Sequence, residues 1–296
     1  MPQIPLPPEV RLEQPAGTLP YLQVRSAAAQ ARIYLHGAHL AHWQPAGQAP
    51  VLWMSRSSWF APDKPLRGGV PVCFPWFGPK ADAPAAPVHG FARVLPWELA
   101  QAQVDAQGRV LLTLELRTSP ATRAHWPHDF KARMQFTIGQ ALDMALTVEN
   151  SATADLSFEQ ALHTYFAVGD VHQVSVTGLA GATYVDKTDH FQRKVQEDAP
   201  IRIAAETDRL YLNTAATVTL TDPGLKRSIS VSKTGSHSTV VWNPWVAKSK
   251  AMPDFGDDEW PGMICVETVN AADNRVTLAP GRAHTMSALL STAPLP

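Results

Sequence analysis

The feature that most constrains this chain is a series of short segments in which apolar and polar residues alternate, separated by turns. Three pairs of such segments surround short turns and are typical of β-hairpins: residues 97–104 with 109–117, 131–138 with 142–150, and 216–222 with 228–233. Further strands are expected in six segments: 174–178, 209–213, 239–243, 263–270, 275–279 and 284–291. No segment shows a sustained 3.6-residue apolar stripe, and 26 prolines interrupt the rest. This pattern predicts an all-β protein, built as a large antiparallel β-sandwich.

Composition and charge narrow the class of protein. Hydrophobic residues make up 45% of the chain and charged residues 17%, which is typical of a soluble globular protein. The net charge of −1 gives no overall basic field that would attract nucleic acid or an acidic membrane. No apolar run approaches the roughly 20 residues that a membrane span needs, and the first residues do not resemble a secretory signal. We therefore expect a single domain over residues 1–296 in the cytoplasm, without nucleic-acid or membrane partners. A monomer is plausible, but the sequence does not fix the oligomeric state.

Residues 56–93 differ from the rest of the chain, because they are rich in proline, glycine and aromatic residues and show no periodicity. A long irregular stretch within a compact domain is usually either functional or disordered. The aromatic residues in its first half argue against disorder there. We expect ordered loops that line one face of a sheet.

Glu267 interrupts the apolar segment MICVETVN, residues 263–270. Strand alternation places it on one face with Met263, Cys265 and Val269, whereas Ile264 and its alternate neighbours face the other way. An ionised carboxylate is costly to bury without a partner. Two interpretations follow: an internal glutamate paired with an arginine or lysine, or a general base at the floor of a pocket.

Three other side chains could join such a site. His163, in ALHTYF, lies on an apolar strand and is either a hydrogen-bonded core residue or a proton donor, since its ordinary pKa is near 6.5. Arg67 precedes two glycines and Arg93 ends the segment HGFAR. The forked guanidinium group suits phosphate or carboxylate ligands, although each arginine could equally be a surface residue.

The sequence gives no sign of a metal, cofactor or nucleophile. Cys73 and Cys265 lie in apolar surroundings and are expected to be buried free thiols, without the spacing of a zinc site. The serine motif GxSxG is absent. His36, His39 and His42 are spaced three residues apart, so in a strand His36 and His39 point to opposite faces. We expect no metal and no cofactor.

Several segments, taken in order along the chain, resemble one known family. They are LRGGVPVCFPWFGP, HGFARVLPWEL, ALHTYFAVGD, YVDKTD, VVWNPW and DFGDDEWPGMICVETVN. Together they resemble the D-hexose-6-phosphate mutarotases, also called glucose-6-phosphate 1-epimerases, in the aldose 1-epimerase (galactose mutarotase-like) superfamily. The resemblance implies a β-supersandwich with a shallow sugar cleft. It also implies interconversion of the α and β anomers of a hexose 6-phosphate, above all glucose 6-phosphate, without a cofactor.

The resemblance also implies roles for particular residues. Glu267 matches the family's general base and His163 its general acid, which we expect to be a carboxylate and an imidazolium. Arg67 and Arg93 match arginines that recognise the phosphate. Two further residues match groups around the sugar: His89 near the ring oxygen and Asp186 at the sugar hydroxyls.

One departure and several alternatives stay open. Some relatives carry glutamine directly before HGFAR, where this chain has Val88, so that contact is missing or moved and the preferred sugar is in doubt. Trp76 and Phe77 either pack in the core or contact the sugar ring. A non-catalytic carbohydrate-binding module or sugar sensor on the same fold is the main alternative function. An epimerase for free aldoses and a glycosidase with two carboxylates are less favoured.

Overall fold

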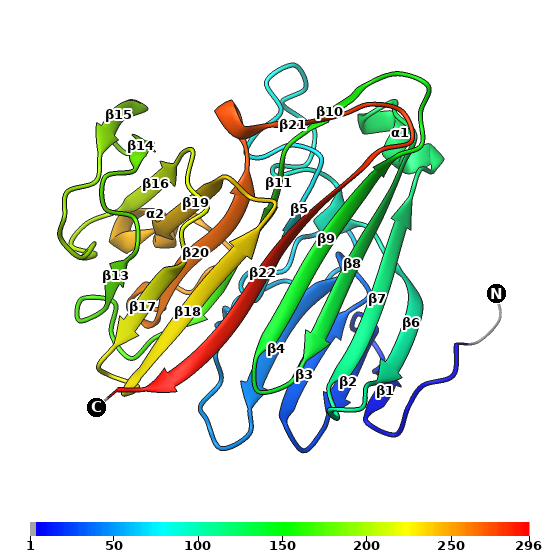
Figure 1. Ribbon diagram of the computed structural model, residues 1–296, viewed down its shortest axis with the longest axis horizontal. Coiled ribbons are helices and arrows are strands. Elements are labelled where there is room, and N and C mark those ends of the chain that lie inside the picture. The colour runs from blue at the N-terminus through cyan, green and yellow to red at the C-terminus, as the bar shows by residue number, and fades with distance from the viewer. Residues whose placement is uncertain (1–3, 296) are drawn as a thin grey trace.

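The computed structural model describes residues 4–295, which form four antiparallel sheets and a few short helices (Figure 1). The first large sheet has the strand order β13-β17-β18-β22-β9-β8-β7-β6. Its strands are β6 (Glu98–Val104), β7 (Val110–Arg117), β8 (Phe130–Ile138), β9 (Leu142–Asn150), β13 (Ser175–Thr177), β17 (Val218–Asp222), β18 (Arg227–Thr234) and β22 (Ala283–Pro294).

The second large sheet has the order β15-β14-β16-β19-β20-β11-β5, with β12 also paired to β20. Its strands are β5 (Val72–Cys73), β11 (Gln160–Leu162), β12 (Tyr165–Ala167), β14 (Thr183–Asp186), β15 (Gln192–Val195), β16 (Thr207–Tyr211), β19 (Ser238–Asn243) and β20 (Met263–Asn270).

Smaller elements complete the chain. A four-stranded sheet contains β1 (Val10–Glu13), β2 (Tyr21–Arg25), β3 (Ala29–Tyr34) and β4 (His39–Pro45), and a two-stranded sheet contains β10 (Leu156–Phe158) and β21 (Val276–Leu278). The helices are α1 (Pro120–His125), α2 (Trp245–Ala251), and the 3₁₀ turns η1 (Ala92–Val94), η2 (Trp260–Gly262) and η3 (Ala272–Asn274).

The main core lies between the first large sheet and the layer behind it (Figure 1). One hydrophobic cluster joins side chains of β7, β8, β9 and β22 with those of the four-stranded sheet and of β20. This confirms the predicted all-β antiparallel sandwich. The expectation of a single domain stays a prediction, supported by this cluster, which extends from Val10 to Leu290.

Strand β20 is central, and all eight of its residues are buried. Ile264 and Val266 point into the main core, whereas Met263, Cys265 and Val269 belong to a second cluster on the opposite face. The two faces therefore divide as the alternation predicted. Glu267 belongs to the second face, which is the side that carries the cavity described below.

The predicted hairpins are confirmed as β6–β7, β8–β9 and β17–β18. Sequence analysis missed the two short helices because a helix of six or seven residues is too short to show a periodic stripe. In α1 a local signal was present, since Ser119 and Thr122 form a capping box with Pro120 at the first helical position. The strands of the N-terminal sheet were not predicted individually.

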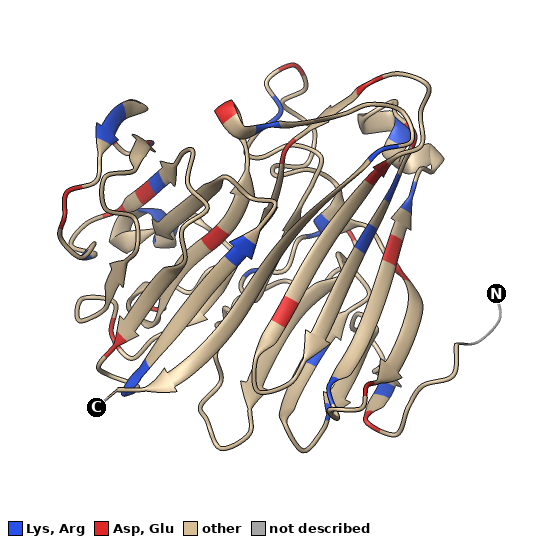
Figure 2. Cartoon of the chain, viewed as in Figure 1, with Lys and Arg blue, Asp and Glu red and all other residues tan. Residues whose placement is uncertain are grey.

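Residues 56–93 are ordered loops, interrupted by the two residues of β5 and the start of η1. They lie over one edge of the second large sheet, where they form much of the cavity wall. Lysine and arginine side chains are interspersed with aspartate and glutamate along the chain (Figure 2). Within residues 4–295, none of the helices has the length and apolar character of a membrane span.

Candidate active site

A cavity of about 820 Å³ opens on the outer face of the second large sheet. Its floor comes from the sheet and its walls come from the loops at 59–94 and the segment at 248–254. The volume is in the range of sites that enclose small organic ligands. Of the six residues proposed from the sequence, five line this cavity: Arg67, His89, Arg93, His163 and Glu267.

His163 and Glu267 meet at the floor. His163 Nε2 lies 3.4 Å from Glu267 Oε1, and the exposed fractions of the two side chains are 9% and 1%. Glu267 is carried by β20, while His163 lies in the short gap between β11 and β12, both of which pair with β20. The buried glutamate therefore meets a histidine rather than the arginine or lysine of the alternative interpretation. Glu267 Oε2 and His163 Nδ1 have no hydrogen-bond partner within the described part of the chain.

Aromatic rings fix the orientation of the imidazole. The His163 ring stacks on Tyr165 with 4.8 Å between centroids, and Trp242 meets its edge at 6.0 Å. The ring of His89 lies 5.7 Å from that of His163. These contacts hold Nε2 toward the carboxylate.

Burial does not favour the charge state that we expected for this pair. Burial raises the pKa of Glu267 well above its usual value, and Lys187 opposes this rise only in part. Burial also lowers the pKa of His163 well below its usual value, and Arg93 and Arg67 lower it further. Desolvation disfavours charge on both groups, so the uncharged forms are favoured, in contrast to the carboxylate and imidazolium expected from the sequence.

The two arginines differ in their surroundings. Arg67 donates from Nε and Nη2 to Asp254 at 3.3 and 3.2 Å, and from Nη1 to the Tyr165 hydroxyl at 3.1 Å. Burial lowers its pKa, but Tyr165 and Asp254 raise it overall. Arg93 donates from Nη2 to the carbonyl oxygen of Val88 at 2.7 Å, and no carboxylate within residues 4–295 forms an ion pair with it. Its charge is therefore available to an anionic ligand.

His89 is held as a neutral group. Its Nδ1 accepts a hydrogen bond from the backbone N–H of Gly78 at 3.1 Å, which leaves the proton of the neutral ring on Nε2. Burial, followed by Arg93 and His163, lowers its pKa well below the usual value. His89 therefore offers the cavity a hydrogen-bond donor without charge.

Asp186 is not brought into the cavity. Its oxygens accept hydrogen bonds from Thr188 and from Lys194 Nζ, the latter at 2.8 Å. The neighbouring Lys187, in the turn that follows β14, lines the cavity. The role of Asp186 at the sugar hydroxyls, which the resemblance implied, therefore finds no support in the lining of the cavity.

Sequence analysis missed Lys187 and Asp208, which both line the cavity. Lys187 Nζ lies 3.0 Å from Asp208 Oδ1 and 5.0 Å from the centre of the Phe77 ring. A signal for Asp208 existed, because it lies two residues before Leu210 and so shares its face of the strand, and Leu210 packs in the second cluster. The predicted strand began one residue too late to include it.

Other sequence expectations have clear outcomes. Phe77 and Val88 line the cavity, whereas Trp76 is buried and donates from Nε1 to the carbonyl oxygen of Pro87 at 2.9 Å. Both cysteines are buried free thiols, as predicted. His36 Nε2 contacts the carbonyl oxygen of Lys64 at 2.8 Å, and His39 is fully buried beneath the loop that carries Arg67.

The antiparallel β-sandwich is shared with a solved galactose mutarotase-like protein from Clostridium acetobutylicum, with a TM-score of 0.76 at 12% identity. Residues 21–291 match the family model of aldose 1-epimerase, so the chain belongs to the aldose 1-epimerase family.

Individual relatives agree with this assignment. A Salmonella typhimurium protein named "Putative glucose-6-phosphate 1-epimerase" is 42% identical over 242 residues, which are 82% of this chain and 80% of that protein. A protein of the same name from Cenchrus ciliaris is 33% identical over 300 residues, 99% of this chain and 90% of its own. The crystal structure of "a putative mutarotase (YeaD)" from Salmonella typhimurium has a TM-score of 0.91 at 36% identity and covers 99% of this chain and 96% of its own.

Proposed function

We propose that this protein interconverts the α and β anomers of a hexose 6-phosphate, with glucose 6-phosphate as its main substrate. The observation that carries the proposal is the 3.4 Å contact of His163 with Glu267 in a cavity that also holds Arg67 and Arg93. The proposal includes a cytoplasmic location, because hexose phosphates are made and consumed by metabolism inside the cell.

The reaction requires one proton acceptor and one proton donor at neighbouring oxygens of the sugar. Glu267 takes the proton of the anomeric hydroxyl O1, and the O1–C1 bond becomes a carbonyl. The C1–O5 bond breaks, and the electron pair stays on O5, which takes a proton from His163. Rotation about C1–C2 and reversal of both transfers give either anomer, and each such group contributes roughly 10²–10⁴-fold to the rate.

The phosphate group of the substrate acts on the pKa of His163. Arg93 and Arg67 lower the pKa of His163 in addition to burial. A phosphate dianion between these arginines offsets their positive charge, because an opposite charge reverses this effect. Phosphate binding therefore favours the protonated His163 that ring opening requires. Because the neutral pair holds one proton on Glu267, transfer of that proton to His163 gives the imidazolium and the carboxylate together.

The remaining cavity groups hold the sugar in place. His89 donates from Nε2, and the Lys187–Asp208 pair offers a donor and an acceptor to sugar hydroxyls. Phe77 lies beside this pair and provides an apolar ring face. Asp208 thus replaces Asp186 as the proposed carboxylate for hydroxyl recognition.

Magnetisation-exchange NMR on equilibrated glucose 6-phosphate tests the proposal, with glucose and galactose 6-phosphate measured beside it. The wild-type protein should accelerate exchange between anomers, and His163→Asn and Glu267→Gln should each lower the rate by about 10²–10⁴-fold. His172→Asn and Glu98→Gln are matched controls, because neither residue lines the cavity. Wild-type exchange no faster than buffer would instead support a non-catalytic sugar-binding module.

A further inference from the structure

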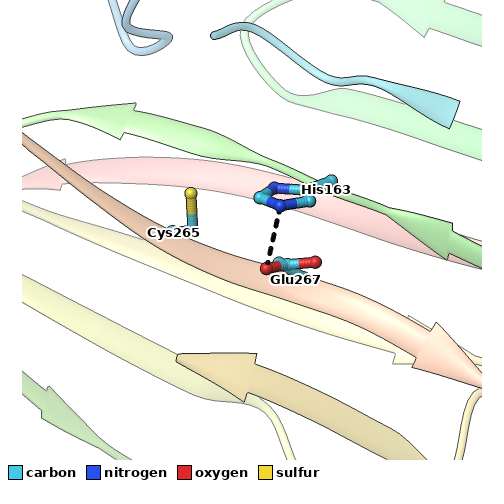
Figure 3. A group of neighbouring side chains, drawn as sticks. All are labelled: His163, Cys265 and Glu267. Carbon is cyan, nitrogen blue, oxygen red and sulfur yellow. Dashed lines mark ion pairs between the residues drawn. The ribbon is translucent and has the colours of Figure 1, made fainter. Parts of the chain in front are cut away.

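A third reactive side chain, which the proposed reaction does not use, is buried beside the floor of the cavity. Cys265 lies two residues before Glu267 on the same face of β20. His163 lies close to both, in the segment between β11 and β12 (Figure 3). One ligand atom from each of the three, the cysteine Sγ, a histidine nitrogen and a carboxylate oxygen, all lie within 4.8 Å of one another. All three side chains are buried, and Cys265 is a free thiol.

The unmet bonding capacity of the cluster points toward a ligand. Glu267 Oε2 is buried and has no hydrogen-bond partner within residues 4–295, and His163 Nε2 meets the carboxylate at 3.4 Å without forming a hydrogen bond. The cluster borders the cavity through His163 and Glu267, so an ion can enter from that side.

We propose that His163, Cys265 and Glu267 form a binding site for a thiophilic divalent cation, with Zn²⁺ as the best fit, and that the bound ion excludes the sugar from His163 and Glu267. Zinc is bound by thiolate sulfur at about 2.3 Å and by histidine nitrogen or carboxylate oxygen at about 2.0–2.2 Å. Two ligand atoms on one tetrahedral zinc are thus about 3.3–3.6 Å apart. The contact of 3.4 Å between His163 and Glu267 has this spacing, whereas separations within the cluster extend to 4.8 Å, so the Cys265 side chain must move closer when the ion binds.

Ligand type explains the choice of metal. Thiolate and imidazole ligands select zinc over magnesium or calcium, which prefer oxygen. Three protein ligands leave the fourth tetrahedral position open toward the cavity, as in zinc sites that bind water or substrate.

The charges around the cluster are compatible with a cation. The thiolate of Cys265 and the carboxylate of Glu267 together neutralise a divalent ion. Two nearby cations already have partners, since Arg67 pairs with Asp254 and Lys187 pairs with Asp208. Arg93 lacks such a carboxylate within the described residues and opposes the ion.

A titration of the purified full-length protein with Co²⁺ tests the binding step without using activity. The wild type should give a near-ultraviolet thiolate-to-cobalt band that saturates at one ion per chain and is displaced by Zn²⁺. Cys265→Ala should lose the band, and Cys265→Ser, which keeps the size of the side chain, is the second variant should the first fail to fold. Cys73→Ala is the matched control, since Cys73 is also a buried thiol but lies outside the cluster, and it should keep the band.

A second measurement tests exclusion of the sugar, and this arm rests on the proposed function. Zn²⁺ should inhibit glucose 6-phosphate anomer exchange competitively, and EDTA should reverse the effect. Cys265→Ala should keep its metal-free rate and raise the inhibition constant by about tenfold or more, since even an indirect contact to a metal ligand contributes 10–100-fold to affinity. A cobalt band that persists in Cys265→Ala, no band in the wild type, or equal zinc inhibition of both proteins would overturn the proposal. An inactive wild type that keeps the band would contradict the proposed function alone.

Discussion

The two cavity arginines should contribute unequally to phosphate recognition. An arginine has five N–H donors. Arg67 uses three of them on Asp254 and Tyr165, whereas Arg93 uses one, on the carbonyl oxygen of Val88. The charge of Arg67 is also compensated by its carboxylate partner, while residues 4–295 offer no such partner to Arg93. We therefore predict that Arg93 is the principal phosphate ligand.

The size of the difference follows from the donors that remain free. Two charge-assisted hydrogen bonds from Arg93 are worth about 3–6 kcal/mol, or roughly 10²–10⁴-fold in kcat/KM. Two bonds from the compensated Arg67 are closer to neutral ones, worth about 1–3 kcal/mol, or roughly 5–150-fold. The matched variants are Arg93→Met and the double variant Arg67→Met/Asp254→Asn, which does not leave a buried carboxylate unpaired.

The assay compares anomer exchange of glucose 6-phosphate with that of glucose. Arg93→Met should lose the larger factor on the phosphorylated sugar and leave glucose nearly unchanged. Its folding serves as a control: Arg93 is 8% exposed and its Nε lacks a partner in the described chain, so the apolar variant should unfold at a temperature no lower than the wild type. A greater loss in the double variant, or an equal loss on both sugars, would refute the reasoning.

Three further predictions concern pH and backbone geometry. Lys187 lowers the pKa of Glu267, so Lys187→Met should move the acid limb of kcat/KM to higher pH, whereas Lys250→Met, outside the cavity, should leave the profile unchanged. Because burial raises the pKa of Glu267 from 4.5, the folded state binds the extra proton and the wild type loses stability as the pH rises above about 4.5. Glu267→Gln should therefore gain unfolding free energy relative to wild type between pH 5 and 8, measured by urea denaturation, and a constant difference would contradict this. Gly90→Ala should cost more than Gly108→Ala in the same assay: both glycines have φ near +75 to +80°, but a Cβ at Gly90 would lie 2.0 Å from a carbonyl oxygen, and one at Gly108 meets nothing within 4 Å. The strain common to both is about 1–3 kcal/mol, and equal losses would show that the close contact is relieved.

The fold was predictable because it rests on local patterns, and the site was predictable only in part. Alternation correctly assigned both faces of β20, and turn residues located three hairpins. The 3.4 Å contact of His163 with Glu267 depends on the pairing of β11 and β12 with β20, which no local pattern contains. The resemblance selected these two residues, which line one cavity, and it also selected Asp186, which does not line it. The pKa directions were also missed, because desolvation depends on how completely the folded protein covers each group.

The complete burial of β20 affects how this protein can diverge. One face of the strand supports the sandwich and the other supports the proposed proton-transfer pair, so a substitution there tends to disturb stability and chemistry together. The loops at 56–93 are constrained at Arg67, His89 and Arg93, but other positions of the cavity wall, such as the exposed Val88, lie outside any strand. New sugar preferences should therefore arise by exchange of loop residues such as Val88 above an unchanged floor, and a family with this fold can vary its substrates without rebuilding its catalyst.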